Sequence, residues 1–164
     1  MLGSILRTSG LALVVGALLG GLARAETSLA GTWSLVAADD LHPDGRRTPG
    51  YGDGPEGRLI IDAAGRYSLQ IFKRERARFV SGDKRKGSPA EYESAVLGSS
   101  THFGTVRVDD AARILTFRID RASYPNWEGT EQKRRFELIG DELSYQVPSA
   151  PDGTVPISVW RRVR

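Results

Sequence analysis

The sequence predicts an all-β protein: an antiparallel β-barrel of about eight strands, with one short helix in a long loop. After residue 30 the chain is a series of short segments in which apolar and polar residues alternate, separated by turn signals. No long segment has helical periodicity. The 164 residues include 19 Gly and 8 Pro without regular spacing, which favours a fold with many turns. Eight antiparallel strands close a small barrel around a ligand-sized interior.

The first 25 residues are expected to be a signal peptide and not part of the barrel. Arg7 precedes an apolar run, Leu11–Leu22, that leads to the small-residue site Ala23-Arg24-Ala25. This order is typical of secretory signals, and the run is too short to cross a bilayer. We expect cleavage near Ala25, one domain over residues 26–164, and export to the periplasm or the medium. An uncleaved anchor is the alternative, because Arg24 lies close to the cleavage point.

Composition narrows the function classes. The absence of Cys excludes disulfides, thiolate metal sites, cysteine nucleophiles and a lipoprotein anchor. The chain has 23 basic and 20 acidic residues, and loss of Arg7 and Arg24 with the signal would leave 21 and 20. A nearly neutral domain without an aromatic series for base stacking is not expected to bind nucleic acid.

The predicted strands follow from alternation and turns. Trp33, Leu35 and Ala37 share one face of the first strand. The others are Arg58–Asp62, Arg66–Phe72, Phe103–Val108, Ile114–Ile119, Glu131–Leu138, Glu142–Val147 and Val155–Arg162. The side chains expected to line the interior or fill the core are Tyr67, Leu69, Ile71, Leu115, Phe117, Leu143 and Tyr145.

Two connections are too long for tight turns. Lys73–Gly98 contains Ser88-Pro-Ala-Glu91, a capping-box pattern that predicts a short helix ending at Gly98. Its first part, Lys73–Lys86, carries a net charge of +5 and is either a solvated flap or a contact for anionic lipid or envelope polymer. The second connection, Arg121–Thr130, contains Pro125 and Gly129, which forbid a regular strand.

Two short motifs at the ends of the barrel sequence resemble the lipocalin-type barrel. Gly31-Thr-Trp33 opens the first strand, and Val159-Trp-Arg-Arg162 lies in the last. In that architecture an Arg near the end of the barrel covers the Trp of the first strand. Alternation with Ile157 and Val159 favours Arg161 for this role opposite Trp33.

Further segments are more specific and span nearly all of Leu29–Arg162. They are Tyr51-Gly, Gly57-Arg-Leu-Ile-Ile, Phe103-Gly-Thr-Val-Arg-Val-Asp109, the run from Tyr124-Pro-Asn-Trp to Phe136, and Gly140-Asp-Glu-Leu. They resemble the bacterial and fungal lipocalin-like domain family, which is distinct from the lipocalins proper. The resemblance implies an eight-stranded barrel with a small-molecule cavity and, for most members, no assigned activity. Some relatives encoded beside polyketide or terpenoid pathways are thought to act on ring-forming intermediates. Members often carry histidines where this chain has Thr116-Phe-Arg-Ile-Asp120, so the resemblance gives no support for imidazole chemistry there.

Arg134 is the most unusual residue of the predicted barrel. If Phe136 and Leu138 point inward, alternation carries Gln132 and Arg134 inward with them. A buried cation needs a partner, so Arg134 is a candidate anchor for the carboxylate or enolate of a ligand. The alternatives are an internal Asp or Glu partner, or a bulge near Gly129 that leaves Arg134 in solvent.

Other candidate groups are few. Tyr124 and Trp127 either stack on a ligand at the barrel mouth or plug the barrel end.

The only histidines are His42, in a polar turn, and His102, at a predicted strand start, and no metal motif is present. His102 is expected at the surface or partly hydrogen-bonded, with a general base as the alternative. The glycine cluster Gly50–Gly54 predicts a turn or flap.

We therefore expect an exported protein that binds a small hydrophobic or amphipathic molecule in the barrel interior. The predicted ligand contacts are Arg134, Tyr67, Tyr124, Trp127, Tyr145 and Phe117. No cofactor, metal or catalytic residue is assigned. Two alternatives stay open: a cofactor-independent isomerase or cyclase that uses Tyr67, Tyr145 or Arg134 to polarise an enol or carbonyl, and a structural barrel whose basic loop contacts the cell envelope.

Overall fold

The computed structural model describes residues 27–164, so the predicted signal peptide lies outside the described residues. The strands are β1 (Gly31–Leu41), β2 (Arg47–Pro49), β3 (Glu56–Ile61), β4 (Arg66–Phe72), β5 (Ser99–Asp109), β6 (Ile114–Ala122), β7 (Glu131–Ile139), β8 (Glu142–Gln146) and β9 (Val155–Arg162). The helices are α1 (Pro89–Leu97) and the short 3-10 turn η1 (Pro125–Trp127). Within residues 27–164, no helix combines the length and apolar character that a bilayer crossing requires.

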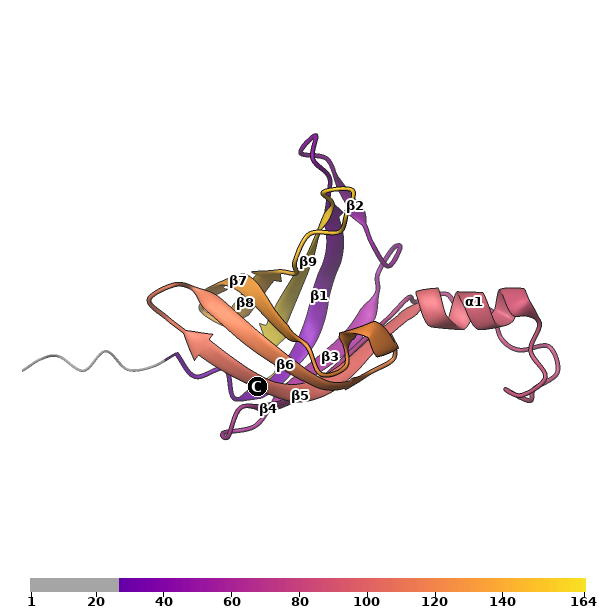
Figure 1. Ribbon diagram of the computed structural model, residues 1–164, viewed down its shortest axis with the longest axis horizontal. Coiled ribbons are helices and arrows are strands. Elements are labelled where there is room, and N and C mark those ends of the chain that lie inside the picture. The colour runs from indigo at the N-terminus through magenta and orange to yellow at the C-terminus, as the bar shows by residue number, and fades with distance from the viewer. Residues whose placement is uncertain (1–26) are drawn as a thin grey trace, which may run out of the picture.

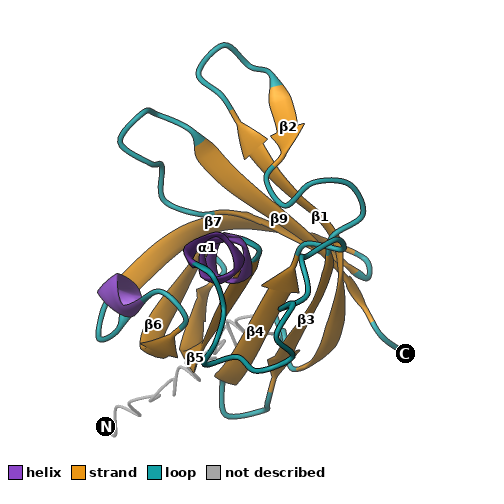
Figure 2. Ribbon diagram, turned by 90° about the vertical axis from the view of Figure 1, so that its right-hand side faces the viewer, coloured by secondary structure: helices purple, strands orange, loops and turns teal. Residues whose placement is uncertain are grey.

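The strands form one closed antiparallel barrel. Neighbouring strands pair in the order β2-β1-β3-β4-β5-β6-β7-β8-β9, and pairing of β1 with β9 closes the ring (Figures 1 and 2). Eight strands make the barrel, because β2 only extends the edge of β1 at Asp39–Leu41. The prediction of an eight-stranded antiparallel barrel with one short helix is confirmed. The strand β2 was not predicted, since three residues are too few to show alternation.

Two irregularities shift the strands relative to the predicted pattern. Trp33, Leu35 and Ala37 were predicted to share one face of β1, but a register shift between Leu35 and Ala37 buries Ala38 together with Trp33 in place of Ala37. A second shift lies between Phe103 and Gly104 in β5, which begins at Ser99, four residues before the predicted start. A Cβ at Gly104 would lie 2.0 Å from the carbonyl oxygen of Arg118, so only glycine fits at this bulge.

The core fills the barrel from the inner faces of the strands. Its largest fully buried side chains are Trp33, Trp160, Tyr145, Phe117, Phe136, Leu59, Leu69, Leu115, Ile119 and Leu143. All seven residues predicted to line the interior or fill the core are buried, which confirms that part of the alternation pattern.

The predicted helix is present and capped as its sequence indicates. The Ser88 hydroxyl accepts a hydrogen bond from the Glu91 amide, and the Glu91 carboxylate accepts one from the Ser88 amide at 2.6 Å. The Gly98 amide donates to the Ser94 carbonyl and ends the helix. Helix α1 has no buried residue and projects away from the barrel (Figure 1).

Arg162, and not Arg161, closes one end of the barrel over Trp33. The Arg162 guanidinium lies 4.1 Å from the Trp33 ring centre and donates to the carbonyl oxygens of Ala30 and Ser28 at 2.6 and 3.1 Å. The prediction for Arg161 was wrong, because that side chain is exposed and pairs with Glu142 at 3.2 Å.

The error came from the choice of inner face for β9. Ile157 and Val159 are half-exposed, whereas Ser158 and Trp160 are buried. Trp160 is the largest side chain of β9 and stacks on Tyr145 in the core, whereas the β-branched Ile157 and Val159 also suit the outer face of a strand.

Replacement of these two neighbouring arginines tests the closure. Arg162→Ala removes a cation–π contact and two charged hydrogen bonds to backbone carbonyls, so we expect the free energy of unfolding to fall by about 2–3 kcal/mol. Arg161→Ala removes only an exposed ion pair and should change it by less than about 0.5 kcal/mol. Urea unfolding followed by Trp fluorescence measures both, and equal effects would contradict the assignment.

Candidate functional site

A cavity of about 300 Å³ occupies one end of the barrel interior. Its lining residues are Asp40, Gly50, Tyr51, Leu69, Ile71, Leu97, Ser100, His102, Trp127, Arg134, Tyr145, Val147, Pro156 and Ser158. Leu97 of α1, Trp127 of η1 and the turn after β2 surround its mouth, and Figure 2 shows α1 in front of this end of the barrel. A larger hollow of about 830 Å³ lies near the start of β1, at the opposite end, between turns. The interior cavity is the candidate site because it gathers buried polar side chains.

Arg134 is the central charged group of this cavity. Strand alternation in β7 turns it inward, and its side chain is only 3% exposed. The guanidinium carbon lies 4.2 Å from the Phe117 ring centre and 5.1 Å from that of Tyr145. One guanidinium nitrogen donates to the Gln132 side-chain oxygen at 2.9 Å. The inward orientation is confirmed, and the alternative of a solvated Arg134 is wrong.

The charge of Arg134 has no acidic partner in the described chain. None of the ion pairs within residues 27–164 includes it. Burial lowers the pKa of Arg134, and the groups acting on it electrostatically are the phenols of Tyr145 and Tyr67. Burial raises the pKa of both phenols, so they are neutral. Because an arginine stays protonated in proteins, the cavity holds one positive charge that the two ring contacts offset only in part.

Two polar groups on the same wall lack hydrogen-bond acceptors. Within the described chain, neither Nε of Arg134 nor the Tyr145 hydroxyl forms a hydrogen bond of regular geometry. Ser158, Trp160 and Arg134 surround the Tyr145 hydroxyl closely enough for irregular hydrogen bonds, which lower its pKa against the larger effect of burial. Tyr145 is 1% exposed and lines the cavity together with Arg134. A buried donor without a partner costs about 1–3 kcal/mol, so this wall favours a ligand that supplies an acceptor.

His102 and Tyr67 form a second polar pair beside Arg134. The Tyr67 hydroxyl lies 2.8 Å from Nδ1 of His102. Burial lowers the pKa of His102 to about 3, with a further contribution from the Arg134 charge, so the imidazole is neutral at ordinary pH. We assign the phenol as the donor and Nδ1 as the acceptor, which leaves the ring hydrogen on Nε2. His102 then adds a neutral donor to the cavity.

The structure separates the six predicted ligand contacts into three groups. Arg134, Tyr145 and Trp127 line the cavity. Phe117 lies beneath the Arg134 guanidinium and Tyr67 behind His102, so both support lining residues and are not themselves part of the wall. Tyr124 is 47% exposed, outside the lining, and contacts the edge of the Trp127 ring at 5.5 Å between centres.

Sequence reasoning missed several lining residues, above all His102. It was expected at the surface or partly hydrogen-bonded, but it is 4% exposed and packs at 5.9 Å against the Trp127 ring. The signal was available, because alternation back from Val106 through Gly104 reaches His102 and Ser100 on the inner face. Tyr51 and Asp40 reach the mouth only through the fold of the β1–β2 hairpin. No group of three His, Asp or Glu side chains within residues 27–164 is placed to hold a metal ion.

Comparison with known proteins places the chain in a family. It belongs to the lipocalin-like domain family, whose model matches residues 30–163. Among solved structures it is similar to a mutant of the fluorescent protein UnaG, with 18% sequence identity, a TM-score of 0.35, and coverage of 82% of this chain and 96% of that one. A comparison with curated proteins finds no match.

The neutral state of His102 makes stability depend on pH. Below about pH 6.5 the imidazole of the unfolded chain takes up a proton, while the folded one does so only near pH 3. The unfolded state therefore binds more protons in this window, and acidification destabilises the fold. From His102 alone we expect a loss of about 1.4 kcal/mol between pH 7.5 and pH 5.5.

Urea unfolding of the wild type and of His102→Gln at both pH values measures this loss. The variant keeps a polar side chain that does not titrate, so the difference between the two proteins removes the contribution of all other groups. An identical pH dependence in both proteins would show that His102 titrates normally.

Proposed function

We propose that the protein binds a small amphipathic molecule in the barrel cavity, with an anionic head at Arg134 and an apolar body toward the mouth. The observation that carries the proposal is the buried guanidinium of Arg134, which has no acidic partner in the described chain and lies beside the buried Tyr145 hydroxyl, which forms no hydrogen bond of regular geometry. A carboxylate or an enolate oxygen would accept hydrogen bonds from both groups and compensate the charge.

The rest of the lining supports an apolar body of modest size. Leu69, Ile71, Val147 and Pro156 supply apolar walls, and Trp127 supplies an aromatic face near the mouth. The volume of about 300 Å³ lies at the small end of ordinary ligand pockets, which span roughly 300–1,000 Å³. The expected ligand is therefore a compact molecule, smaller than most drug-sized ligands.

The electrostatics of the cavity favour binding over acid–base catalysis. A general base works best when its pKa lies near the working pH. The pKa of His102 is lowered to about 3 by burial and by Arg134, and burial raises the pKa of Tyr67. Neither group is poised to exchange protons with a ligand near neutral pH, so we prefer a carrier or sequestering role to an isomerase or cyclase.

The proposal includes export, and its support is the signal-peptide pattern of residues 1–25. Intact and native mass spectrometry of the protein purified from its own host tests both parts together. An exported protein should begin near Glu26, and a carrier should retain a small anionic molecule that is released on unfolding.

The decisive variant removes the positive charge but keeps an apolar side chain. In Arg134→Met we expect the dissociation constant of naphthoic acid to rise by about 10–100-fold, because charged hydrogen bonds contribute about 1.5–3 kcal/mol each. The neutral analogue naphthylmethanol should bind the wild type and the variant within about threefold of each other. Titration calorimetry measures both ligands.

Arg135→Met is the matched control, since the next residue of β7 faces solvent. It should leave both affinities unchanged. The stability of Arg134→Met should equal or exceed that of the wild type, because an uncompensated buried charge is removed. Equal loss of acid and alcohol binding in Arg134→Met would contradict the assignment of an anionic head.

A further inference from the structure

The segment Lys73–Gly98, here called the arm, stands apart from the barrel. A hydrogen bond from the Lys73 amide to the Gly98 carbonyl, 2.8 Å long, closes its base. Beyond this base, α1 and its preceding loop project away from the strands, and α1 has no buried residue (Figure 1). A helix of nine residues is about 14 Å long, so the tip of the arm lies well clear of the barrel wall.

The loop of the arm is folded back on α1 in a fixed arrangement. The rings of Phe79 and Tyr92 meet edge to face at 5.4 Å, and the Tyr92 hydroxyl accepts a hydrogen bond from the Gly87 amide at 3.0 Å. The Glu91 carboxylate accepts hydrogen bonds from the amides of Val80 and Ser88 at 2.8 and 2.6 Å. These contacts hold the backbone of the loop against α1, so the tip of the arm presents one preformed surface.

That surface is strongly basic. Over residues 73–86 the chain has seven basic residues against Glu75 and Asp83, a net charge of +5, and α1 adds Glu91 and Glu93. Within the described chain, the ion pair of Arg85 with Asp83 is the only one in the arm, and both of its side chains are near the tip. Most of the positive charge is therefore free to act on a partner.

The arm also exposes large apolar side chains to solvent. Val80, at the turn of the loop, is 96% exposed, which is the largest exposure among the large apolar residues of the described chain. Val96 and Leu97 on α1 are 59% and 63% exposed. A protruding apolar side chain among Lys and Arg residues is the combination by which proteins bind the interface of an anionic bilayer.

We propose that the arm docks the barrel on the surface of an anionic phospholipid bilayer, with Val80 in the interface and the basic residues on the headgroups. Charge complementarity selects this partner over a second copy of the chain, because two arms of the same charge repel each other. The proposal does not depend on ligand binding. Leu97 belongs both to the arm and to the cavity lining, so docking would bring the mouth of the cavity close to the bilayer.

The experiment places a polarity-sensitive fluorophore at the tip. The chain has no Cys, so Val80→Cys gives a single labelling site. We expect a blue shift on vesicles of phosphatidylcholine with phosphatidylglycerol, no shift on phosphatidylcholine alone, and reversal of the shift by salt. The same fluorophore at Ile139→Cys, 76% exposed at the far end of β7, should not shift.

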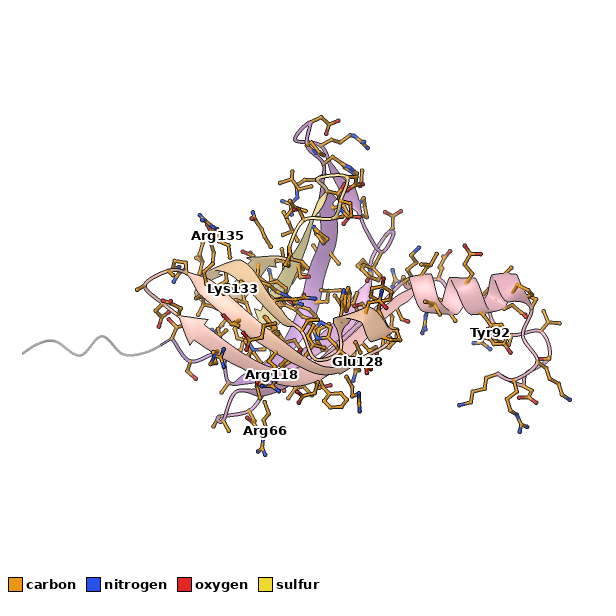
Figure 3. All side chains as sticks on the ribbon, in the orientation of Figure 1. Arg66, Tyr92, Arg118, Glu128, Lys133 and Arg135 are labelled. Atoms are coloured by element: carbon orange, nitrogen blue, oxygen red, sulfur yellow. The ribbon has the colours of Figure 1, made fainter. Side chains whose placement is uncertain are left out.

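A matched pair of charge variants in the Val80→Cys background identifies the contact. Joint replacement of Lys84, Arg85 and Lys86 by Gln should weaken vesicle binding by about 10–100-fold, since each basic residue near an anionic surface contributes about fivefold. Joint replacement of Arg118, Lys133 and Arg135 by Gln removes the same charge from the barrel wall, away from the arm (Figure 3), and should weaken it less than about threefold.

Three results would overturn the proposal. One is no shift of the Val80 fluorophore on anionic vesicles, and another is equal weakening by both charge variants. The third is a shift that grows with protein concentration in the absence of vesicles, which would identify a second copy as the partner. None of these variants changes residues 1–72, so the N-terminal segment is the same in every protein compared. Differences in vesicle binding therefore come from the replaced side chains.

Discussion

The pairing of β1 with β9 is the contact on which the rest of the molecule depends. It joins the two ends of the described chain over eight residue pairs and turns an open sheet into a barrel without free edges along most of its length. Arg162 strengthens this closure, because its guanidinium covers the Trp33 ring and binds two carbonyl oxygens of the segment that precedes β1. Closure also removes water from the interior. The electrostatic properties of the cavity follow from that exclusion, since charges interact strongly only where the effective dielectric constant is low.

Inside the closed barrel, one arginine sets the state of its neighbours. Arg134 lies between the rings of Phe117 and Tyr145, and its charge together with burial keeps His102 neutral. Within residues 27–164 the wall offers hydrogen-bond donors to the cavity near this charge, while Asp40, the one acidic residue of the lining, acts on Tyr51 and not on Arg134. Such an arrangement is complementary to an anion, and the proposed ligand class rests on it.

The two ends of the barrel are built differently. Trp33 and Arg162 close one end with packed and hydrogen-bonded side chains, whereas the other carries the cavity mouth, η1 and the arm. The cavity mouth lies beside a projecting basic segment, so the two ends of the barrel differ in chemical character. If the arm contacts a bilayer, an amphipathic ligand would have a short path between lipid and cavity, and its apolar part would be shielded from water at both places.

The sequence by itself determined the eight barrel strands and the capped helix, because these depend on local rules: alternation in a strand has a period of two, and a capping box acts within one turn. For Arg134, alternation offered an inward orientation but left a solvated one open, and only the folded barrel shows that it is buried. The sequence could not choose between Arg161 and Arg162, since both faces of β9 carry apolar residues and only packing against Trp33 decides which face is inside. His102 was missed for a different reason: alternation back from Val106 places it on the inner face, but the strand was predicted to begin only at Phe103. The partners of Arg134 were also beyond the sequence. Phe117 and Tyr145 lie on β6 and β8, the strands on either side of β7, and only the pairing register of these strands places both rings at the Arg134 guanidinium.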